Sequence, residues 1–310
     1  MPWERCSEFV ANCIRGRVKV AAVSRRRQHN PRKHAVFHRR VKVAAASAAV
    51  NTIHENTPCF IGGWKMNRKT LVIHVPHCTT YIPEDVRDKL LLTDEELRQN
   101  LLAFTDWYTD ELFSLPEAVQ VIYPFSRIVC DPERYRGDDE EPMAKTGFGA
   151  VYCRDAFLRP LRKVDSETRK HLLKHYDAHH RNLEKAVMSS IDLTGRCLIV
   201  DSHSFSARPL PYEPCQEDDR PDICIGTDER LTPKQLEEMA VMHFQNAGFS
   251  VSVNYPYSGT MIPLKYCGDS RVSSIMVEVN RGLYLDQGTF RKSDGYQRVK
   301  DTIGWFLERL

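Results

Sequence analysis

The chain has 310 residues, of which 42% are hydrophobic and 27% charged, a composition ordinary for a folded globular protein with one large domain or two small ones. No apolar run approaches the roughly eighteen residues of a membrane-spanning helix, so we expect a cytoplasmic protein with no membrane partner. The ten cysteines form no Cys-x-x-Cys pair, which favours reduced thiols over a disulfide framework.

The net charge of +3 conceals an asymmetry along the chain. Residues 1–65 hold 13 Lys and Arg residues against 3 acidic ones, whereas residues 66–310 hold 31 against 38. The first segment lacks periodicity, so we expect a disordered extension, or sequence upstream of a true start at Met66. A basic arm that binds nucleic acid and an organellar import peptide are the weaker alternatives.

Residues 66–310 alternate between short aliphatic runs and helical patterns, and are expected to form a single domain. The strand-like runs are residues 71–75, 119–124, 197–201, 249–253 and 274–279. Helical patterns extend from 94 to about 113, from 166 to about 189, from 233 to 248, and from 293 to near the end. This alternation predicts an α/β domain whose sheet is covered on both faces.

Polar side chains stand where three of these strands are expected to end. His77 follows the first strand, His203 follows the run 197–201, and Glu278 lies near the end of the last run with Arg281 behind it. In open α/β sheets, ligands bind at the carboxyl edge of the strands. Two histidines, a glutamate and an arginine at this edge predict a mononuclear zinc hydrolase with small-molecule substrates.

The predicted zinc site needs a third ligand. The helix 94–113 offers Asp106 and Asp110, four residues apart on one face, and we favour Asp106 because it stands beside two aromatic residues. His74 lies inside a strand and is expected to be packed or hydrogen-bonded. Asp201 points to the same side of its strand as His203, so it either orients a ligand imidazole or caps a turn.

Glu278 is embedded in an apolar run, where a carboxylate is costly unless it is paired or functional. Beside a metal it would take the proton of the attacking water, whereas the alternative is a salt bridge to Arg281. Arg281 and Arg127 suit a ligand that carries carboxylates, and the alternative for Arg127 is an ion pair with Asp131.

The helix 166–189 carries four histidines. The spacing of its apolar residues places His180 inward, where it is either a core residue or a contact to substrate or oxyanion. The same spacing places His171, His175 and His179 toward solvent.

Eight motifs, in order, resemble the N-formylglutamate amidohydrolase family, and together they cover about residues 70–287. They are His74-Val75-Pro76-His77, Thr105-Asp106-Trp107, Ser126-Arg127-Ile128-Val129-Cys130-Asp131, Tyr176 with His180, Asp201-Ser202-His203-Ser204-Phe205, Asp222-Ile223-Cys224-Ile225-Gly226-Thr227, Asn254-Tyr255-Pro256-Tyr257-Ser258-Gly259 and Glu278-Val279-Asn280-Arg281. The resemblance implies a three-layer α/β/α phosphorylase/hydrolase-like fold, related to zinc carboxypeptidases, with a mixed, mostly parallel sheet. It also implies hydrolysis of N-formyl-L-glutamate to formate and glutamate.

By this resemblance, His77, Asp106 and His203 hold Zn²⁺ and Glu278 is the glutamate of the last strand. Asn254 joins Arg127, Arg281 and His180 as groups that hold carboxylates or stabilise the oxyanion. The sequence departs from the family at Cys78-Thr79, where Ser-Gly is usual, so the recognised acyl group or amino acid can differ. The alternatives are a carboxypeptidase-like or other N-acyl amino acid deacylase with the same metal, and a metal-free binding protein with a basic arm for nucleic acid.

Overall fold

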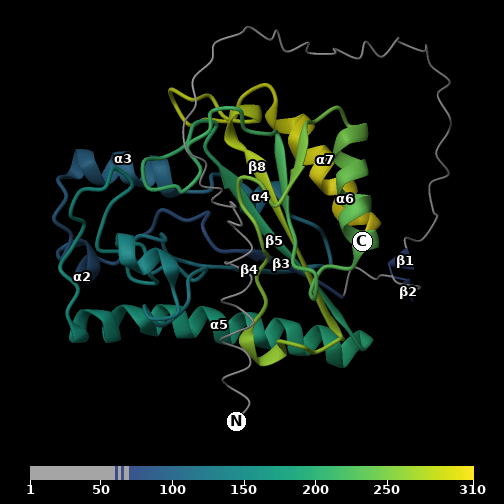
Figure 1. Cartoon of the computed structure of the whole chain (residues 1–310), viewed down its shortest axis with the longest axis horizontal. Helices are drawn as coiled ribbons and strands as arrows, with labels where there is room; N and C mark the ends of the chain where they lie inside the picture. The colour runs from purple at the N-terminus through teal and green to yellow at the C-terminus, as the bar shows by residue number, and fades with distance from the viewer. Residues whose placement is uncertain (1–59, 62–63, 66–69) are drawn as a thin grey trace, which may run out of the picture.

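The computed structural model describes residues 60–61, 64–65 and 70–310 (Figure 1). The predicted extension, residues 1–65, lies outside the described residues except for two short strands, β1 (Phe60–Ile61) and β2 (Trp64–Lys65), which pair antiparallel. No helix of the described part of the chain is long and apolar enough to cross a membrane.

A six-stranded sheet in the order β4-β3-β5-β8-β6-β7 forms the centre of residues 70–310. Its strands are β3 (Leu71–Val75), β4 (Val119–Ile122), β5 (Cys197–Phe205), β6 (Ile223–Gly226), β7 (Val251–Val253) and β8 (Val272–Asn280). β4, β3, β5 and β8 are mutually parallel, whereas β6 runs antiparallel to β8 and β7 runs parallel to β6. Four strands therefore bring their carboxyl ends to one edge.

Helices cover both faces of this sheet, which confirms the predicted mixed α/β architecture (Figure 1). They are α2 (Glu84–Arg87), α3 (Asp94–Phe104), α4 (Thr109–Leu112), α5 (Ser166–Thr194), α6 (Lys234–Asn246) and α7 (Tyr296–Arg309), with 3-10 turns η2 (Pro142–Thr146), η3 (Leu264–Tyr266) and η4 (Arg281–Leu283). The α6 and α7 side chains pack in one apolar cluster with the sheet, and those of α5 pack in another on the opposite face.

The alternation of side chains along each strand decides which residues reach which face. In β3, Leu71 and Ile73 belong to the α6–α7 cluster, while Val72 belongs to the α5 cluster. His74 shares the parity of Val72 and contacts α5 through His179. Asp201 and His203 have matching parity in β5 and lie on the α5 side, so they share one face of the strand as predicted.

Several element boundaries differ from the prediction. β5 extends to Phe205 because it pairs in parallel with β8 over nine residues, so His203 lies within the strand and not beyond it. Glu278 lies within β8, as predicted. The short strand β6 was not predicted. α5 continues to Thr194 and ends at Gly195, which adopts a φ of 81°. β7 begins at Val251 and α7 begins at Tyr296, each later than expected.

The predicted helix 94–113 is wrong in one important respect, because the chain leaves the helix after Phe104. Thr105 is extended, Tyr108 has a left-handed φ of 62°, and α4 then starts at Thr109. Asp106 lies in this break, so it does not share a helix face with Asp110. The break is anchored where the Asp106 amide donates a hydrogen bond to the His77 carbonyl at 2.9 Å.

Candidate metal centre

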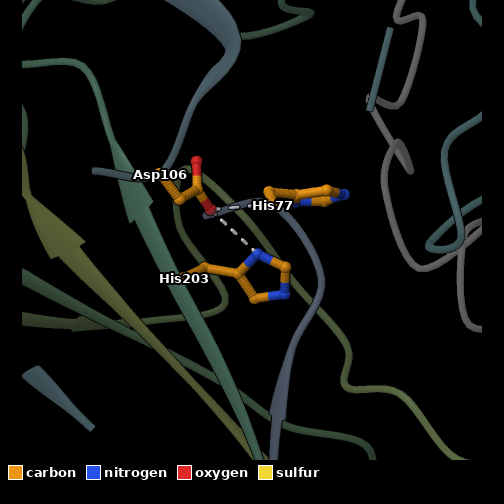
Figure 2. Close-up of side chains that lie close together, drawn as sticks. All are labelled: His77, Asp106 and His203. Carbon is orange, nitrogen blue, oxygen red and sulfur yellow. Dashed lines mark hydrogen bonds and ion pairs between the residues drawn. The ribbon is translucent and has the colours of Figure 1, made fainter. Parts of the chain in front are cut away.

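Three buried side chains converge at the carboxyl edge of the parallel strands (Figure 2). Asp106 Oδ2 lies 3.3 Å from His203 Nδ1 and 3.7 Å from His77 Nδ1. His77 comes from the loop after β3, Asp106 from the break between α3 and α4, and His203 from β5. The structure thus brings together the three residues predicted as ligands.

The donor atoms of this group fit a zinc ion. Zinc–ligand bonds of about 2.0–2.2 Å in a tetrahedral site place neighbouring ligand atoms about 3.3 Å apart, close to the two separations from Asp106. His77 Nδ1 is buried and has no hydrogen-bond partner among the residues that the structure describes. A buried imidazole nitrogen left unpaired in this way is costly unless a cation occupies its lone pair.

Each imidazole is oriented by a second carboxylate on the opposite side of its ring. His77 Nε2 lies 2.8 Å from Asp131 Oδ1, and His203 Nε2 lies 3.1 Å from Asp201 Oδ1. When Nε2–H donates a hydrogen bond to these carboxylates, the Nδ1 lone pair of both rings is directed toward Asp106. This arrangement is typical of metal-ligating histidines, and it makes Asp201 an orienting residue and not a turn cap.

Asp106 is held in its charged form by the groups around it. Arg281 Nη2 donates to Asp106 Oδ1 at 3.2 Å, and the Ser204 amide donates to Oδ2 at 3.1 Å. Burial opposes ionisation, but His203, His77 and Arg281 outweigh it and hold the pKa of Asp106 well below its usual value. The carboxylate is therefore available as an anionic ligand at neutral pH.

His203 has the opposite electrostatic tendency in the metal-free protein. Burial disfavours its charged form, but Asp201 and Asp106 raise its pKa well above the usual value. A cation bound at Nδ1 would displace that proton, because only the neutral ring can be a ligand.

A second group of titratable side chains lies behind His203. Asp201 Oδ1, which faces His203, also lies 2.9 Å from His74 Nδ1, and His74 Nε2 lies 2.8 Å from His179 Nε2. Glu133 Oε1 approaches His74 Nδ1 at 3.1 Å. His74 lies inside β3 and is hydrogen-bonded to side chains of β5 and α5, as expected for a histidine in a strand.

Both histidines of this second group have perturbed pKa values. Burial lowers the pKa of His74, but Asp201 and Glu133 more than offset this effect and raise it to about 9. Burial and the neighbouring His74 lower the pKa of His179 to about 2. His74, Glu133 and Asp201 also have the spacing of a metal site. Asp201 Oδ1 of this group also lies 3.1 Å from His203 Nε2, so it is shared with the first group.

Glu278 stands beside His203 in the parallel register of β5 and β8 and shares its face of the sheet. Its side chain is buried, and Oε2 has no hydrogen-bond partner within residues 70–310. Burial, opposed by His203 and reinforced by Asp106, raises the pKa of Glu278 to about 8. The alternative salt bridge to Arg281 is wrong, because Arg281 is turned toward Asp106 and Ser204.

Residues 69–285 match the N-formylglutamate amidohydrolase family. The chain belongs to this family. Its fold is similar to the crystal structure of N-formylglutamate amidohydrolase from Ralstonia eutropha JMP134, with 21% identity, a TM-score of 0.66, and coverage of 77% of this chain and 92% of that one. It is also similar to the crystal structure of gene product Atu2144 from Agrobacterium tumefaciens, with 16% identity, a TM-score of 0.55, and coverage of 78% and 90% respectively. The curated proteins contain no match.

The family match confirms the resemblance seen in the motifs. As a member of the N-formylglutamate amidohydrolase family, the protein is a hydrolase that acts on an amide bond.

The two arginines predicted to bind substrate are instead occupied by protein groups. Arg127 Nη2 donates to Asp131 Oδ2 at 2.7 Å and Arg127 Nε donates to the Tyr152 hydroxyl at 3.1 Å, so the alternative ion pair with Asp131 is formed. Arg281 binds Asp106, and its Nη1 donates to the Ala103 carbonyl at 2.8 Å.

The prediction for the histidines of α5 is wrong for one of them. His179 is the buried histidine of this helix and contacts His74, whereas His180 is half-buried. His180 Nε2 lies 3.0 Å from the Pro132 carbonyl, and its ring stacks on Tyr176.

Asn254 lies away from the described contacts of the metal centre. Its Oδ1 accepts hydrogen bonds from the Thr227 and Gly259 amides, and its Nδ2 donates to the Thr227 hydroxyl. A substrate role for Asn254 stays a prediction.

Sequence reasoning missed the contact of Asp131 with His77 and that of His179 with His74. Asp131 ends one of the eight motifs, and this position is the signal in the sequence that could have indicated it. The parity of His74 in β3 points it toward α5 and could have indicated a partner on that helix.

Proposed function

We propose that the protein is a zinc-dependent amidohydrolase that converts N-formyl-L-glutamate and water into formate and L-glutamate. Family membership supports the substrate. The observation that carries the metal dependence is the convergence of three donor atoms around the unpaired Nδ1 of buried His77.

In this proposal His77, Asp106 and His203 hold the zinc ion. Zinc would supply a Lewis acid that polarises the scissile carbonyl and increases the acidity of a water molecule. Asp131 and Asp201 accept hydrogen bonds from Nε2–H of the two imidazoles and so keep their Nδ1 atoms aimed at the ion. Arg281 holds the Asp106 carboxylate in place by donating a hydrogen bond to Oδ1, the oxygen that does not face the two histidines.

Glu278 is the proposed general base. Its carboxylate accepts a proton as the water oxygen forms a bond to the formyl carbon. When the C–N bond breaks, the same proton passes to the leaving nitrogen, so that formate and the free amino acid result. A pKa near 8, raised by burial, suits a group that must both accept and donate a proton near neutral pH.

The remaining predicted site residues take supporting roles in this proposal. Arg127 and Arg281 act through Asp131 and Asp106, because their guanidinium groups are bound there. His180 remains a candidate to contact the substrate, with one ring nitrogen bound to Pro132.

The main alternative is another N-acyl amino acid deacylase with the same metal centre. It is favoured by Cys78-Thr79, which directly follow the ligand His77 where the family usually has Ser-Gly.

The test is a panel of N-formyl and N-acetyl amino acids incubated with the zinc-loaded protein and with chelator-treated protein. We expect N-formyl-L-glutamate to be cleaved fastest, with formate and glutamate released in equal amounts, and we expect chelation to abolish cleavage until zinc is restored. Faster cleavage of N-acetyl substrates would favour the alternative. Cleavage that survives complete removal of the metal would refute zinc dependence.

A further inference from the structure

Three arginines lie in the polar network around the metal centre, and two of them make side-chain hydrogen bonds to protein groups. Arg281 is bound to Asp106, Ala103 and Ser204. Arg127 is bound to Asp131 and Tyr152. The third, Arg134, lies three residues after Asp131.

The guanidinium group of Arg134 makes no hydrogen bond to any residue that the structure describes. Its one ion pair joins Nε to Asp131 Oδ2 across 3.6 Å, and Nε is buried without an acceptor. The backbone is nevertheless fixed, because the Tyr176 hydroxyl donates to the Arg134 carbonyl at 3.0 Å. The side chain is 23% exposed.

Asp131 cannot satisfy Arg134, because its oxygens are already used. Oδ1 faces His77 Nε2 at 2.8 Å, and Oδ2 accepts hydrogen bonds from Arg127 and from the Tyr152 hydroxyl. The Asp131 carboxylate is therefore shared by two guanidinium groups, those of Arg127 and Arg134. Although burial opposes it, Tyr152 and Asp131 raise the pKa of Arg134, so the group stays charged. Glu141 also acts on this charge without a hydrogen bond to it, so the Arg134 guanidinium lacks a carboxylate partner at hydrogen-bond distance.

We propose that Arg134 binds a carboxylate of the N-acyl amino acid and so makes the enzyme selective for anionic substrates. The inference rests on the proposed function and names the residue that decides its substrate class. A guanidinium fork matches a carboxylate in a bidentate arrangement, and the buried Nε gains the acceptor that it lacks in the free protein. Arg134 contacts neither Glu278 nor a ligand atom in the structure, so it acts on substrate binding and not on the proton transfers.

The test compares zinc-loaded wild-type protein with Arg134→Gln and Arg134→Lys on two substrates, N-formyl-L-glutamate and its diamide, which lacks both carboxylates. We expect Arg134→Gln to lower kcat/KM for the anionic substrate by about 10- to 100-fold, mainly through KM, the usual worth of a charge-assisted hydrogen bond. The diamide should be a poor substrate that changes less than about threefold. Arg134→Lys, which keeps the charge and loses the fork, should fall between. The matched control is Arg136→Gln, because Arg136 is an exposed residue two positions away that pairs with Asp177.

Binding of glutarate to zinc-loaded protein, measured by calorimetry, gives a readout that needs no turnover. Arg134→Gln should weaken it at least about tenfold, whereas Arg136→Gln should not. Equal losses of kcat/KM on both substrates, or unchanged glutarate binding, would overturn the role of Arg134. If the wild type cleaves no N-formyl amino acid, the proposed function fails, and the glutarate measurement still decides whether Arg134 binds carboxylates.

Discussion

Asp131 Oδ1 lies 2.8 Å from His77 Nε2, while Nδ1 of the same ring faces Asp106 with no hydrogen-bond partner in the described part of the chain. This relationship fixes the tautomer of His77 and leaves one lone pair for a cation. Asp131 also accepts a hydrogen bond from Arg127. Burial tends to raise the pKa of Asp131, but Arg127 and His77 outweigh this effect and lower it well below its usual value.

Asp131→Asn should therefore weaken zinc binding by about 10- to 100-fold, the usual cost of losing a group that orients a metal ligand. Competition with a chromophoric chelator measures this affinity. Glu111→Gln is the control, because Glu111 pairs with Lys292 in a partly exposed ion pair. Unchanged zinc affinity in Asp131→Asn would show that Asp131 does not orient His77 for zinc binding.

The three proposed ligands should also be separable by metal content. We expect one zinc ion per chain in the wild type, and almost none in His77→Ala, His203→Ala or Asp106→Asn, as measured by elemental analysis. Asp110→Asn is the matched control, because Asp110 lies in α4 beyond the break that positions Asp106. A zinc content near one in either histidine variant would exclude that histidine as a ligand.

We expect the ionisation of Glu278 to make the free energy of unfolding of the metal-free protein fall as the pH rises. Burial raises its pKa to about 8 in the folded state, against 4.5 for an ordinary glutamate. Between these values the unfolded chain has released the proton that the folded protein keeps, so the free energy of unfolding falls as the pH rises from about 4.5 to about 8. Glu278→Gln removes this effect and should be more stable than the wild type at pH 8.5, by on the order of a few kcal/mol, with a smaller difference at pH 5.

Urea unfolding of both metal-free proteins at the two pH values measures this difference. A variant less stable than the wild type at pH 8.5 would contradict the burial of an unpaired carboxylate.

Much of the site was predictable because it rests on strands. The aliphatic runs around residues 71–75, 197–201 and 274–279 identified β3, β5 and β8, and side-chain parity placed Asp201 with His203. The motif residues His77, Asp106 and His203 meet in space as expected.

The errors arose where tertiary contacts override local pattern. The capping box and periodicity of α3 do not indicate that the helix ends at Phe104. The chain leaves the helix there because the Asp106 amide donates a hydrogen bond to the His77 carbonyl, a contact that local sequence does not reveal. On α5, the choice between the adjacent residues His179 and His180 depended on His74, a partner on a distant strand. The partner of Arg281 could not be predicted for the same reason, because it is Asp106, 175 residues away in the sequence.

The most direct test of the account is the turnover number of zinc-loaded Glu278→Gln on N-formyl-L-glutamate, with zinc content measured on the same preparation. Glutamine keeps the size of the side chain but cannot accept the proton of the attacking water. We predict a zinc content near one per chain, a kcat lower by about 10²- to 10⁴-fold, and a KM that changes little. Near-normal turnover in the zinc-loaded variant would contradict the assignment of Glu278 as the general base.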